Sequence, residues 1–433
     1  MKLILGLGDT GLSIARFLQS KEVEYRLADS RMHPPLLSEY NKNFSECRPI
    51  LGDWSQKLLD GINEVFISPG IAQDDSIVIW AREKNIPVAS DIELFSRYAK
   101  APIIGITGTN GKSTVTQLLG EMIATSGKNV AIGGNIGEPA LNCLDDKMDY
   151  YVLELSSYQL DYTNKLDLLT GVVLNITPDH LDRYDSFEHY VDSKLSLYQY
   201  CENLVVNSDE KLVPAKKSAK HFGINMPKQD GDFGTVTCHG SCYFLKGDDV
   251  LMDVNEMQLI GEHNVSNILA ALALGDQIGI EMKHMTQRIK NFKGLEHRLE
   301  WVDQQQGITY YNDSKATNAL STIKALNALI DKHENIVLIA GGIAKDEDHS
   351  ELFELIDNDV ASVVLIGKSA KDFERGINKA QTTYADSIKQ AVEIASGMIN
   401  NGVVILSPAC ASFDMFDNFA QRGNEFKRLV LGV

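Results

Sequence analysis

The chain has 433 residues, of which 44% are hydrophobic and 23% are charged, so its composition excludes a disordered or a fibrous protein. Its length is enough for two to four domains of ordinary size. The 59 Asp and Glu residues outnumber the 41 Lys and Arg residues. The resulting net charge of −18, with no basic patch to offset it, disfavours nucleic acid as a partner.

The cysteines and the N-terminus indicate the cellular compartment. Six cysteines are present, and the sole close pair is Cys238 with Cys242, without the second pair or clustered histidines that a zinc site needs. We interpret them as reduced thiols. The sequence begins with a strand at Lys2 rather than a leader, and no apolar run approaches the ~20 residues of a membrane span. We therefore expect a cytoplasmic protein that does not enter a membrane.

Short apolar runs alternate with helix-period stretches along the chain, which is typical of parallel sheets with crossover helices. The first set lies in a domain that we place at residues 1–93. Its strands are predicted at 2–8, 24–30, 64–70 and 86–91, and its helices at 10–20 and 76–85.

A linking helix is predicted at 91–102, and a central domain at 94–297. The central strands are predicted at 102–107, 129–134, 150–156, 171–177 and 203–207, followed by a hairpin-like stretch at 234–252, with helices at 112–127 and 263–279. The last domain, at 298–433, has predicted strands at 308–314, 335–342, 361–367 and 402–409 and a helix at 387–399. The predicted fold is α/β with three domains in series. The first and last are Rossmann-like, and the central one is a P-loop ATPase-like, mostly parallel sheet with a small hairpin portion.

Two glycine-rich loops compete for the chemistry. The first carries Gly6, Gly8 and Gly11 at the spacing of a dinucleotide-binding fingerprint, with Asp29 at the end of the next apolar stretch. Taken alone, this loop suggests an NAD-dependent oxidoreductase.

The second loop, "TGTNGKST", joins a predicted strand to a predicted helix and carries Lys112. Backbone N–H groups, the helix dipole and a lysine together make a cradle for phosphates. The match to a Walker A motif is partial, because Ile106 stands where the first glycine is expected. The alternative is a tight turn with a solvated lysine.

Polar residues follow the central strands: Asn135, Glu154, Asp179 and His180. In an open parallel sheet, ligands bind beyond the carboxyl ends of strands. Glu154 interrupts an apolar strand, which is costly unless a cation or hydrogen bonds receive it, and the Mg²⁺ that accompanies ATP would supply that cation. The alternatives are an ion pair at the strand end for Glu154 and a capping or surface role for His180.

Lys194 lies beside an apolar helical stripe formed by Tyr190, Val191, Leu195 and Tyr198. Its spacing places it at the inward edge of the helix, one turn from both tyrosines. The alternative is a lysine that extends to water.

The chain resembles the Mur ligases, which extend the peptide of the bacterial cell-wall precursor. The resemblance covers nearly the whole chain through "GLGDTGLS", "SPGIA", "DIELF", "GITGTNGKSTVT", "GGNIG", "LELSSYQL", "NITPDHLDRY", "GEHNVSNILAAL", "HRLE", "NDSKATN" and "LSPACASFDMFDNFAQRGNEF". The phosphate loop also occurs in folylpolyglutamate synthases. The N-terminal "GLGDTG" and the C-terminal "SPACASFD" resemble those members that use ATP to add D-glutamate to UDP-N-acetylmuramoyl-L-alanine.

The resemblance implies a role for each site residue. ATP would be bound by Gly108, Thr109, Asn110, Gly111, Lys112, Ser113, Thr114, Asn264, Arg298 and Asp313. The UDP substrate would be bound by Gly8, Asp9, Thr10, Asp29, Ser30, Gly70, Asn135 and His180, and D-glutamate by Lys315, Thr317, Lys345, Ser412 and Phe419. Two Mg²⁺ ions would be held by Ser113, Glu154, His180 and a carbamylated Lys194, and the catalytic residues would be Lys112, Glu154, His180 and Lys194.

One stretch departs from the family pattern, in which Asp or Gly commonly precedes the lysine of the "GG…K" turn. Here Ile343 and Ala344 precede Lys345. The remaining alternatives are another Mur ligase, a folylpolyglutamate synthase-like amide ligase, an NAD-dependent oxidoreductase and a non-catalytic nucleotide switch. We expect small-molecule substrates and a monomer.

Overall fold

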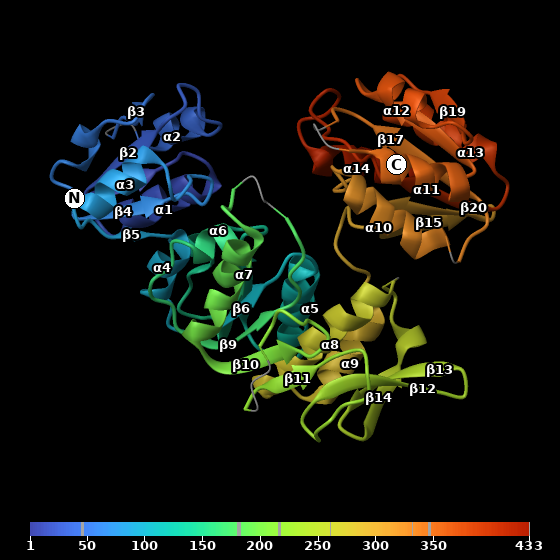
Figure 1. Ribbon diagram of the computed structural model, residues 1–433, viewed down its shortest axis with the longest axis horizontal. Coiled ribbons are helices and arrows are strands. Elements are labelled where there is room, and N and C mark those ends of the chain that lie inside the picture. Colours follow the sequence, from blue (N-terminus) through green and yellow to red (C-terminus); the bar gives the residue numbers. More distant parts are fainter. Residues whose placement is uncertain are drawn as a thin grey trace. The chain divides into compact units, whose positions relative to one another are not determined.

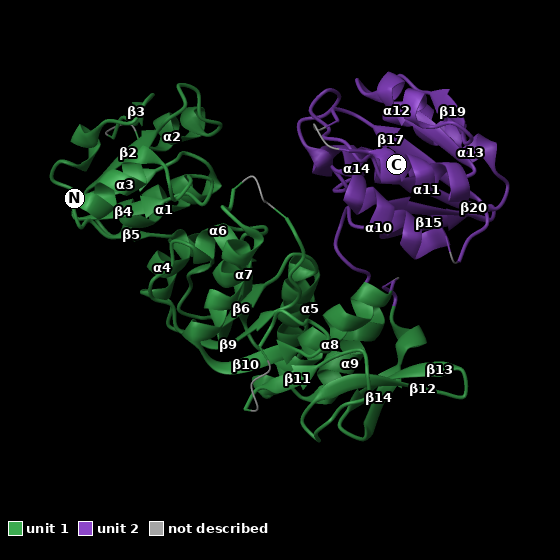
Figure 2. Ribbon diagram, viewed as in Figure 1, with its two compact units in different colours: residues 1–257, 262–291 green, residues 258–261, 292–433 purple. Residues whose placement is uncertain are grey.

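The computed structural model describes residues 1–44, 47–179, 183–214, 218–259, 261–330, 332–344 and 348–432. The chain forms two compact units, one of residues 1–257 and 262–291 and the other of residues 258–261 and 292–433 (Figure 2). His180 and Lys345, both predicted site residues, lie outside the described residues.

The first unit begins with a parallel sheet of strand order β3-β2-β1-β4-β5 (Figure 1). Its strands are β1 Lys2–Leu5, β2 Tyr25–Asp29, β3 Ile50–Leu51, β4 Glu64–Ile67 and β5 Val88–Ala89. Its helical segments are α1 Asp9–Ser20, α2 Leu37–Asn43, η1 Gln56–Leu59, α3 Ser76–Glu83 and α4 Asp91–Ser96. This strand order places the ends of β1 and β4 side by side, where a ligand binds in doubly wound sheets.

The same unit continues into a larger sheet of order β14-β13-β12-β11-β10-β9-β6-β8-β7, which is parallel from β7 to β12 and ends in an antiparallel meander. Its strands are β6 Ile103–Thr107, β7 Val130–Gly134, β8 Tyr150–Glu154, β9 Leu168–Val173, β10 Cys201–Asn207, β11 Lys220–Phe222, β12 Phe233–Cys238, β13 Ser241–Lys246 and β14 Asp249–Asp253. Its helical segments are α5 Lys112–Thr125, η2 Ala140–Cys143, α6 Ser157–Leu160, α7 Phe187–Leu195, η3 Ser196–Tyr200, η4 Val254–Glu256, α8 Glu262–Gln277 and α9 Met282–Asn291.

One apolar core joins the two sheets of this unit. Leu12 and Ile14 of α1, Phe95 of α4 and Tyr151 of β8 belong to the same buried cluster. The rings of Phe95 and Tyr151 meet edge to face, with centroids 5.0 Å apart. Because apolar burial is the main favourable term in folding, this shared core explains why both sheets form a single compact unit.

The second unit has a sheet of order β15-β16-β20-β17-β18-β19, parallel except at the β15/β16 edge. Its strands are β15 Glu300–Gln305, β16 Ile308–Asn312, β17 Ile336–Gly341, β18 Ser362–Ile366, β19 Gln381–Tyr384 and β20 Gly402–Leu406. Its helices are α10 Ala319–Ile330, α11 Ser350–Asp359, α12 Ala370–Gly376, α13 Ile388–Met398 and α14 Phe419–Leu431. Separate apolar clusters cover the two faces of this sheet, as expected for strands that are buried on both sides.

The predicted α/β class, with a mostly parallel central sheet and a hairpin portion, is confirmed. Some predicted elements differ from the structure. The linking helix ends at Ser96, and the strand predicted at 171–177 ends at Val173, so that Asn175 and Thr177 lie in the loop after it. Strands β3, β11, β15 and β19 were not predicted; they are short or carry polar residues, so hydrophobic patterning does not mark them.

Candidate functional site

The loop between β6 and α5 has a backbone that only glycine accommodates well at Gly111. This residue has φ of +82°, and a Cβ there would lie 2.2 Å from Oδ1 of Asn267. The chain then enters α5 at Lys112, so the N–H groups of the first helical turn, which have no acceptor within the helix, border the loop. Such a loop at a helix N-terminus is suited to bind an anion.

The neighbouring segment after β9 holds the loop in place. Asn110 donates its backbone N–H to Oδ1 of Asn175 (2.8 Å), and Nδ2 of Asn175 donates to the carbonyl of Asn110 (3.0 Å). The side chain of Thr109 contacts the hydroxyl of Tyr190 (3.0 Å) and accepts from the N–H of Thr177 (3.1 Å). Sequence analysis did not single out Asn175 or Asn267. The features that could have marked them are the position of Asn175 directly after an apolar strand, in "LNIT", and the position of Asn267 one helical turn after Asn264.

Lys112 folds back on the loop. Its Nζ donates to the carbonyl oxygens of Gly108 (2.8 Å) and Thr109 (2.9 Å). Thr114, two residues further along α5, is half-buried. Asn264 of α8 accepts a hydrogen bond from Asn267 (3.1 Å). Because the side chain of Asn267 lies against Gly111, this bond places Asn264 near the loop.

Glu154 ends β8 beside this loop, and only 2% of it is exposed. Its Oε2 accepts from Oγ of Ser113 (2.7 Å), and its Oε1 accepts from Nδ2 of Asn135 (2.9 Å). The structure therefore brings three predicted residues together from α5, β8 and the end of β7. Their carboxylate and hydroxyl oxygens are donors that Mg²⁺ prefers.

Among the residues that the structure describes, no group of three or more His, Cys, Asp or Glu could hold a metal. Mg²⁺ that binds with ATP does not need a site made of protein ligands alone. Such an ion is usually held by one or two carboxylates together with phosphate oxygens and water. The pairing of Glu154 with the Ser113 hydroxyl fits that pattern.

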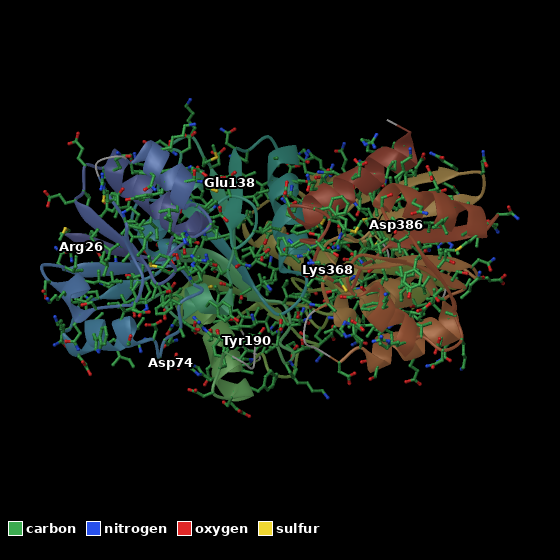
Figure 3. The ribbon with its side chains drawn as sticks, turned by 90° about the horizontal axis from the view of Figure 1, so that it is seen from above. Arg26, Asp74, Glu138, Tyr190, Lys368 and Asp386 are labelled. Carbon is green, nitrogen blue, oxygen red and sulfur yellow. The ribbon has the colours of Figure 1, made fainter. Side chains whose placement is uncertain are left out.

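Lys194, near the end of α7, is 2% exposed, so it does not extend to water. Its Nζ donates to the carbonyl of Gly108 (2.9 Å) and lies 4.6 Å from the ring centroid of Tyr190, which is labelled in Figure 3. Burial, reinforced by the positive charge of Lys112, lowers the pKa of Lys194 to about 7. Tyr198 was expected one turn from Lys194 on the same helix. Instead α7 ends at Leu195, and Tyr198 lies in the 3-10 segment η3.

The first glycine loop is held by a buried carboxylate. Oδ2 of Asp29 accepts from the N–H of Leu7 (2.7 Å) and, with Oδ1, from the guanidinium of Arg31. Burial alone would raise the pKa of Asp29, but the bonds from Arg31 and Leu7 outweigh it and the pKa lies below its usual value. Asp29 thus holds the backbone of the first glycine loop in place. Arg31, which sequence analysis missed, is half-exposed and pairs with Asp29.

Gly8 precedes α1 in an extended conformation, and a Cβ there would meet no atom within 4 Å. Asp9 and Thr10 form the first turn of α1, and Ser30 is exposed after β2. Gly70 is exposed in the loop after β4, where its carbonyl accepts from Arg183 (3.0 Å). These residues share the carboxyl edge of the first sheet.

In the second unit, Lys315 and Phe419 meet. Nζ of Lys315 lies 5.1 Å from the ring centroid of Phe419, the first residue of α14. The buried Arg422 connects this helix to two loops, because its guanidinium donates to the carbonyls of Ser314 (2.8 Å) and Cys410 (3.1 Å). Burial lowers the pKa of Arg422 to about 10.

The remaining predicted residues of this unit lie on the same loops. Thr317 is half-buried after Lys315, and Ser412 is 2% exposed in the loop after β20. Ile343, next to the predicted Lys345, pairs its backbone with Ala411 (2.9 Å in each direction), and Ala344 donates its N–H to Oγ of Ser369 (2.8 Å). Ile343, one of the two residues that depart from the family pattern, therefore forms a backbone bridge to the residue before Ser412.

Asp313 and Arg298, the other predicted nucleotide contacts, belong to the second unit. Asp313 is buried and accepts from Oγ of Ser407 (2.7 Å) and from the N–H of Leu299 (3.0 Å). Burial outweighs these bonds and the nearby charge of Arg298 and raises the pKa of Asp313 to about 7. Arg298 itself is exposed.

Comparison with known proteins accounts for most of the chain. Residues 1–90 match the family described as Mur ligase MurD-like, N-terminal domain. Residues 106–275 match the Mur ligase middle domain, and residues 297–410 match the Mur ligase glutamate ligase domain.

Curated relatives match over their whole length. A UDP-N-acetylmuramoylalanine--D-glutamate ligase of Marinobacter nauticus is 41% identical, with 100% of this chain and 98% of the relative covered. Proteins of the same name from Nitrosococcus oceani and Legionella pneumophila are each 40% identical, and cover 99% and 100% of this chain and 95% and 99% of the relative.

Solved structures share the fold at low sequence identity. A UDP-N-acetylmuramate-alanine ligase of Thermotoga maritima gives a TM-score of 0.63 at 16% identity, covering 100% of this chain and 99% of the other. A pseudomurein peptide ligase of Methanothermus fervidus gives 0.57 at 18% identity, with 100% and 99% covered. With relatives about 40% identical from end to end, the chain belongs to the Mur ligase family.

Proposed function

We propose that this protein is an ATP-dependent ligase that joins D-glutamate to UDP-N-acetylmuramoyl-L-alanine during synthesis of the peptidoglycan precursor. The observation that carries the proposal is the identity of about 40% over the whole length with relatives that bear this activity in their name. The phosphate loop beside the buried Glu154 supports it from the structure.

The reaction needs ATP because a carboxylate is a poor acyl donor. The carboxylate of the L-alanyl group attacks the γ-phosphorus of ATP, so that an O–P bond forms, the bond to ADP breaks and an acyl phosphate results. The amine of D-glutamate then attacks the acyl carbon. Phosphate leaves, the amine loses a proton, and an amide remains.

The phosphate loop and Lys112 would bind the phosphates of ATP. Nζ of Lys112 now bonds the carbonyls of Gly108 and Thr109, so it lies at the loop and is available to exchange these carbonyls for phosphate oxygens. Ser113, Glu154, His180 and Lys194 would hold two Mg²⁺ ions. When bound, Mg²⁺ neutralises charge that develops on the transferred phosphoryl group.

Lys194 would act as a carbamate. Its lowered pKa leaves much of the amine neutral near pH 7, and a neutral amine can attack CO₂. An N–C bond forms between the amine and CO₂, and the nitrogen releases one proton to solvent. The neutral amine thereby becomes a carbamate anion with two oxygens, which suits a hard metal. The burial of Lys194 beside Gly108 supports this assignment.

The first glycine loop would bind the UDP part of the substrate. Gly8, Asp9 and Thr10 offer backbone N–H groups at the start of α1 for this role. By resemblance to the family, Asp29, Ser30, Gly70, Asn135 and His180 would bind the same substrate. Lys315, Thr317, Lys345, Ser412 and Phe419 would bind D-glutamate, as the resemblance implies. The contact between Lys315 and the ring of Phe419 supports a shared site for these two residues.

We also propose domain limits of 1–93, 94–297 and 298–433, a monomeric state and a cytoplasmic location. Within the described residues, no helix has both the length and the apolar character to span a membrane.

Phosphate release tests the proposed activity. With ATP, Mg²⁺ and UDP-N-acetylmuramoyl-L-alanine, release is expected with D-glutamate and not when any one substrate is left out. Equal turnover with L-lysine, meso-diaminopimelate or L-alanine would instead assign another Mur ligase activity. Tight binding of NADH without any phosphate release would favour an oxidoreductase.

A further inference from the structure

Arg183, in the segment before α7, reaches from the larger sheet of the first unit to its N-terminal sheet. Its guanidinium donates to the carbonyls of Pro69 (3.1 Å) and Gly70 (3.0 Å) and also to that of Ile71. Three successive carbonyls of the loop after β4 therefore converge on one planar group. Arginine matches such a set of acceptors because its donors lie in a fixed fork, which a lysine lacks.

The bound loop is itself in contact with the first glycine loop. Ser68 donates its hydroxyl to the carbonyl of Gly6 (3.3 Å), just before Gly8. Tyr162, in the loop after α6, reinforces the attachment, since its hydroxyl donates to the carbonyl of Ile71 (3.0 Å). The position of residues 68–71 thus bears directly on the loop to which we assign the UDP group.

On its other side Arg183 is connected to the ATP loop through aromatic rings. The guanidinium carbon lies 5.0 Å from the ring centroid of Tyr158, and the ring of Tyr158 stacks on Tyr184 at 5.9 Å. Tyr184 meets the ring of Tyr190 at 5.3 Å, and the Tyr190 hydroxyl contacts the side chain of Thr109 (3.0 Å).

Hydrogen bonding and burial fix the positions of the rings that connect Arg183 to the ATP loop. The hydroxyl of Tyr184 donates to Oδ2 of Asp161 (2.8 Å), and Tyr190 is 1% exposed. Through these close-packed contacts, a shift of Thr109 when phosphates bind would displace the surface on which Arg183 rests.

We propose that Arg183 is a positioning residue that couples occupancy of the ATP loop to the affinity of the first sheet for the UDP substrate. The inference rests on the proposed function, because it needs both ligands to bind the first unit. Coupling is reciprocal: a nucleotide that strengthens binding of the UDP substrate is itself bound more tightly in its presence.

The test measures the Kd of UDP-N-acetylmuramoyl-L-alanine by calorimetry on the full chain, with and without a saturating non-hydrolysable ATP analogue and Mg²⁺. The wild type is expected to bind the UDP substrate at least about fivefold more tightly with the analogue. In Arg183→Met the gain should fall below about twofold, while the Kd of the analogue alone stays within about twofold of wild type. Arg183→Lys should restore little, because an ammonium lacks the fork.

Arg82→Met is the matched control. Arg82 donates to the carbonyl of Gln73, two residues beyond Ile71. Because it lies in α3, which packs with the N-terminal sheet, this bond does not connect the N-terminal sheet to the larger one. It should keep the wild-type gain. Tyr158→Leu removes the ring beneath Arg183 and leaves the bonds to the carbonyls, so it should reduce the gain while the UDP substrate alone binds as in wild type.

Kinetics separate coupling from a purely structural role. At saturating UDP substrate, kcat of Arg183→Met should stay within a few-fold of wild type, while the KM for that substrate should rise by about the gain that is lost, roughly threefold to fivefold. An unchanged gain in both Arg183→Met and Tyr158→Leu, or a wild type without any gain, would overturn the inference. Absence of turnover in the wild type with every amino acid would instead overturn the proposed function.

Discussion

At the scale of single residues, the site is defined by buried ionisable groups that form hydrogen bonds with neutral partners. Glu154 receives hydrogen bonds from Ser113 and Asn135, both neutral groups. Lys194 bonds a backbone carbonyl and lies over a ring. Burial of charge is costly, and such groups are typical of sites that a ligand completes.

Glu154→Gln tests the metal role. The amide keeps the shape of the side chain but loses its negative charge, so kcat/KM should fall by roughly 100-fold and half-saturation by Mg²⁺ should need a higher concentration. Steady-state phosphate release over a Mg²⁺ series measures both. Glu138→Gln, an exposed acid after β7, is the control and should behave as wild type. A Mg²⁺ requirement unchanged in Glu154→Gln would contradict the assignment.

Lys194→Ala tests the carbamate. The variant should be nearly inactive, and a small added carboxylic acid is expected to restore part of the turnover by standing in for the missing carboxylate. Phosphate release with and without the acid is the measurement. The exposed Lys165→Ala serves as control. Full activity of Lys194→Ala would show that the lysine has only a packing role.

At the scale of elements, strand ends and helix starts carry the site, and the two glycine loops divide the ligands between them. The ATP loop is closed by Asn267 of α8 and by Asn175 after β9, so it is built from three separate segments. The first loop is held by Asp29 at the end of β2. Each loop therefore responds to a different substitution.

Gly8→Val tests this division. The φ of −109° is open to other residues and the Cβ meets no atom, so the variant should fold, with its side chain in the space assigned to the diphosphate. Loss of backbone contacts to a charged group, ~1.5–3 kcal/mol each, should weaken the UDP substrate at least about tenfold. The Kd for ATP should barely change. Calorimetry that finds an ATP defect with UDP binding intact, or tight NADH binding to the wild type, would show that the loops are wrongly assigned.

Helix α4 begins with a buried acid, Asp91, that is 1% exposed and bonded by Nε2 of Gln159 at 3.3 Å. Burial raises the pKa of Asp91 to about 6. Between pH 3.8 and 6 the folded chain keeps a proton that the unfolded chain has lost, so this group lowers stability as the pH rises. The full cost, up to about 3 kcal/mol, is present above pH 6.

Asp91→Asn removes this titration. Relative to wild type, its free energy of unfolding should rise by about 2 kcal/mol between pH 4 and pH 7, as measured by urea unfolding at both values. The exposed Asp74→Asn should show no such trend. A stability difference for Asp91→Asn that is the same at both pH values would contradict the raised pKa.

At the scale of the whole molecule, hydrophobic patterning was enough to predict the fold class and most central strands, and the glycines and lysine of "TGTNGKST" were enough to predict the phosphate loop. Glu154 stood out because an acid in an apolar strand needs a partner. Arg183, Asn267 and Arg31 could not be found this way, because each acts through tertiary contacts with segments far along the chain. The end of α7 at Leu195 was also missed, since the stripe continues into a 3-10 segment.

The central claim is that ATP activates the L-alanyl carboxylate for attack by D-glutamate. Transfer of ¹⁸O tests it most directly: UDP-N-acetylmuramoyl-L-alanine labelled with ¹⁸O in its terminal carboxylate is turned over with ATP, Mg²⁺ and D-glutamate, and both products are weighed by mass spectrometry. The account predicts one ¹⁸O atom in each released phosphate and one left in the new amide. Phosphate without ¹⁸O, or both ¹⁸O atoms retained in the UDP product, would contradict it.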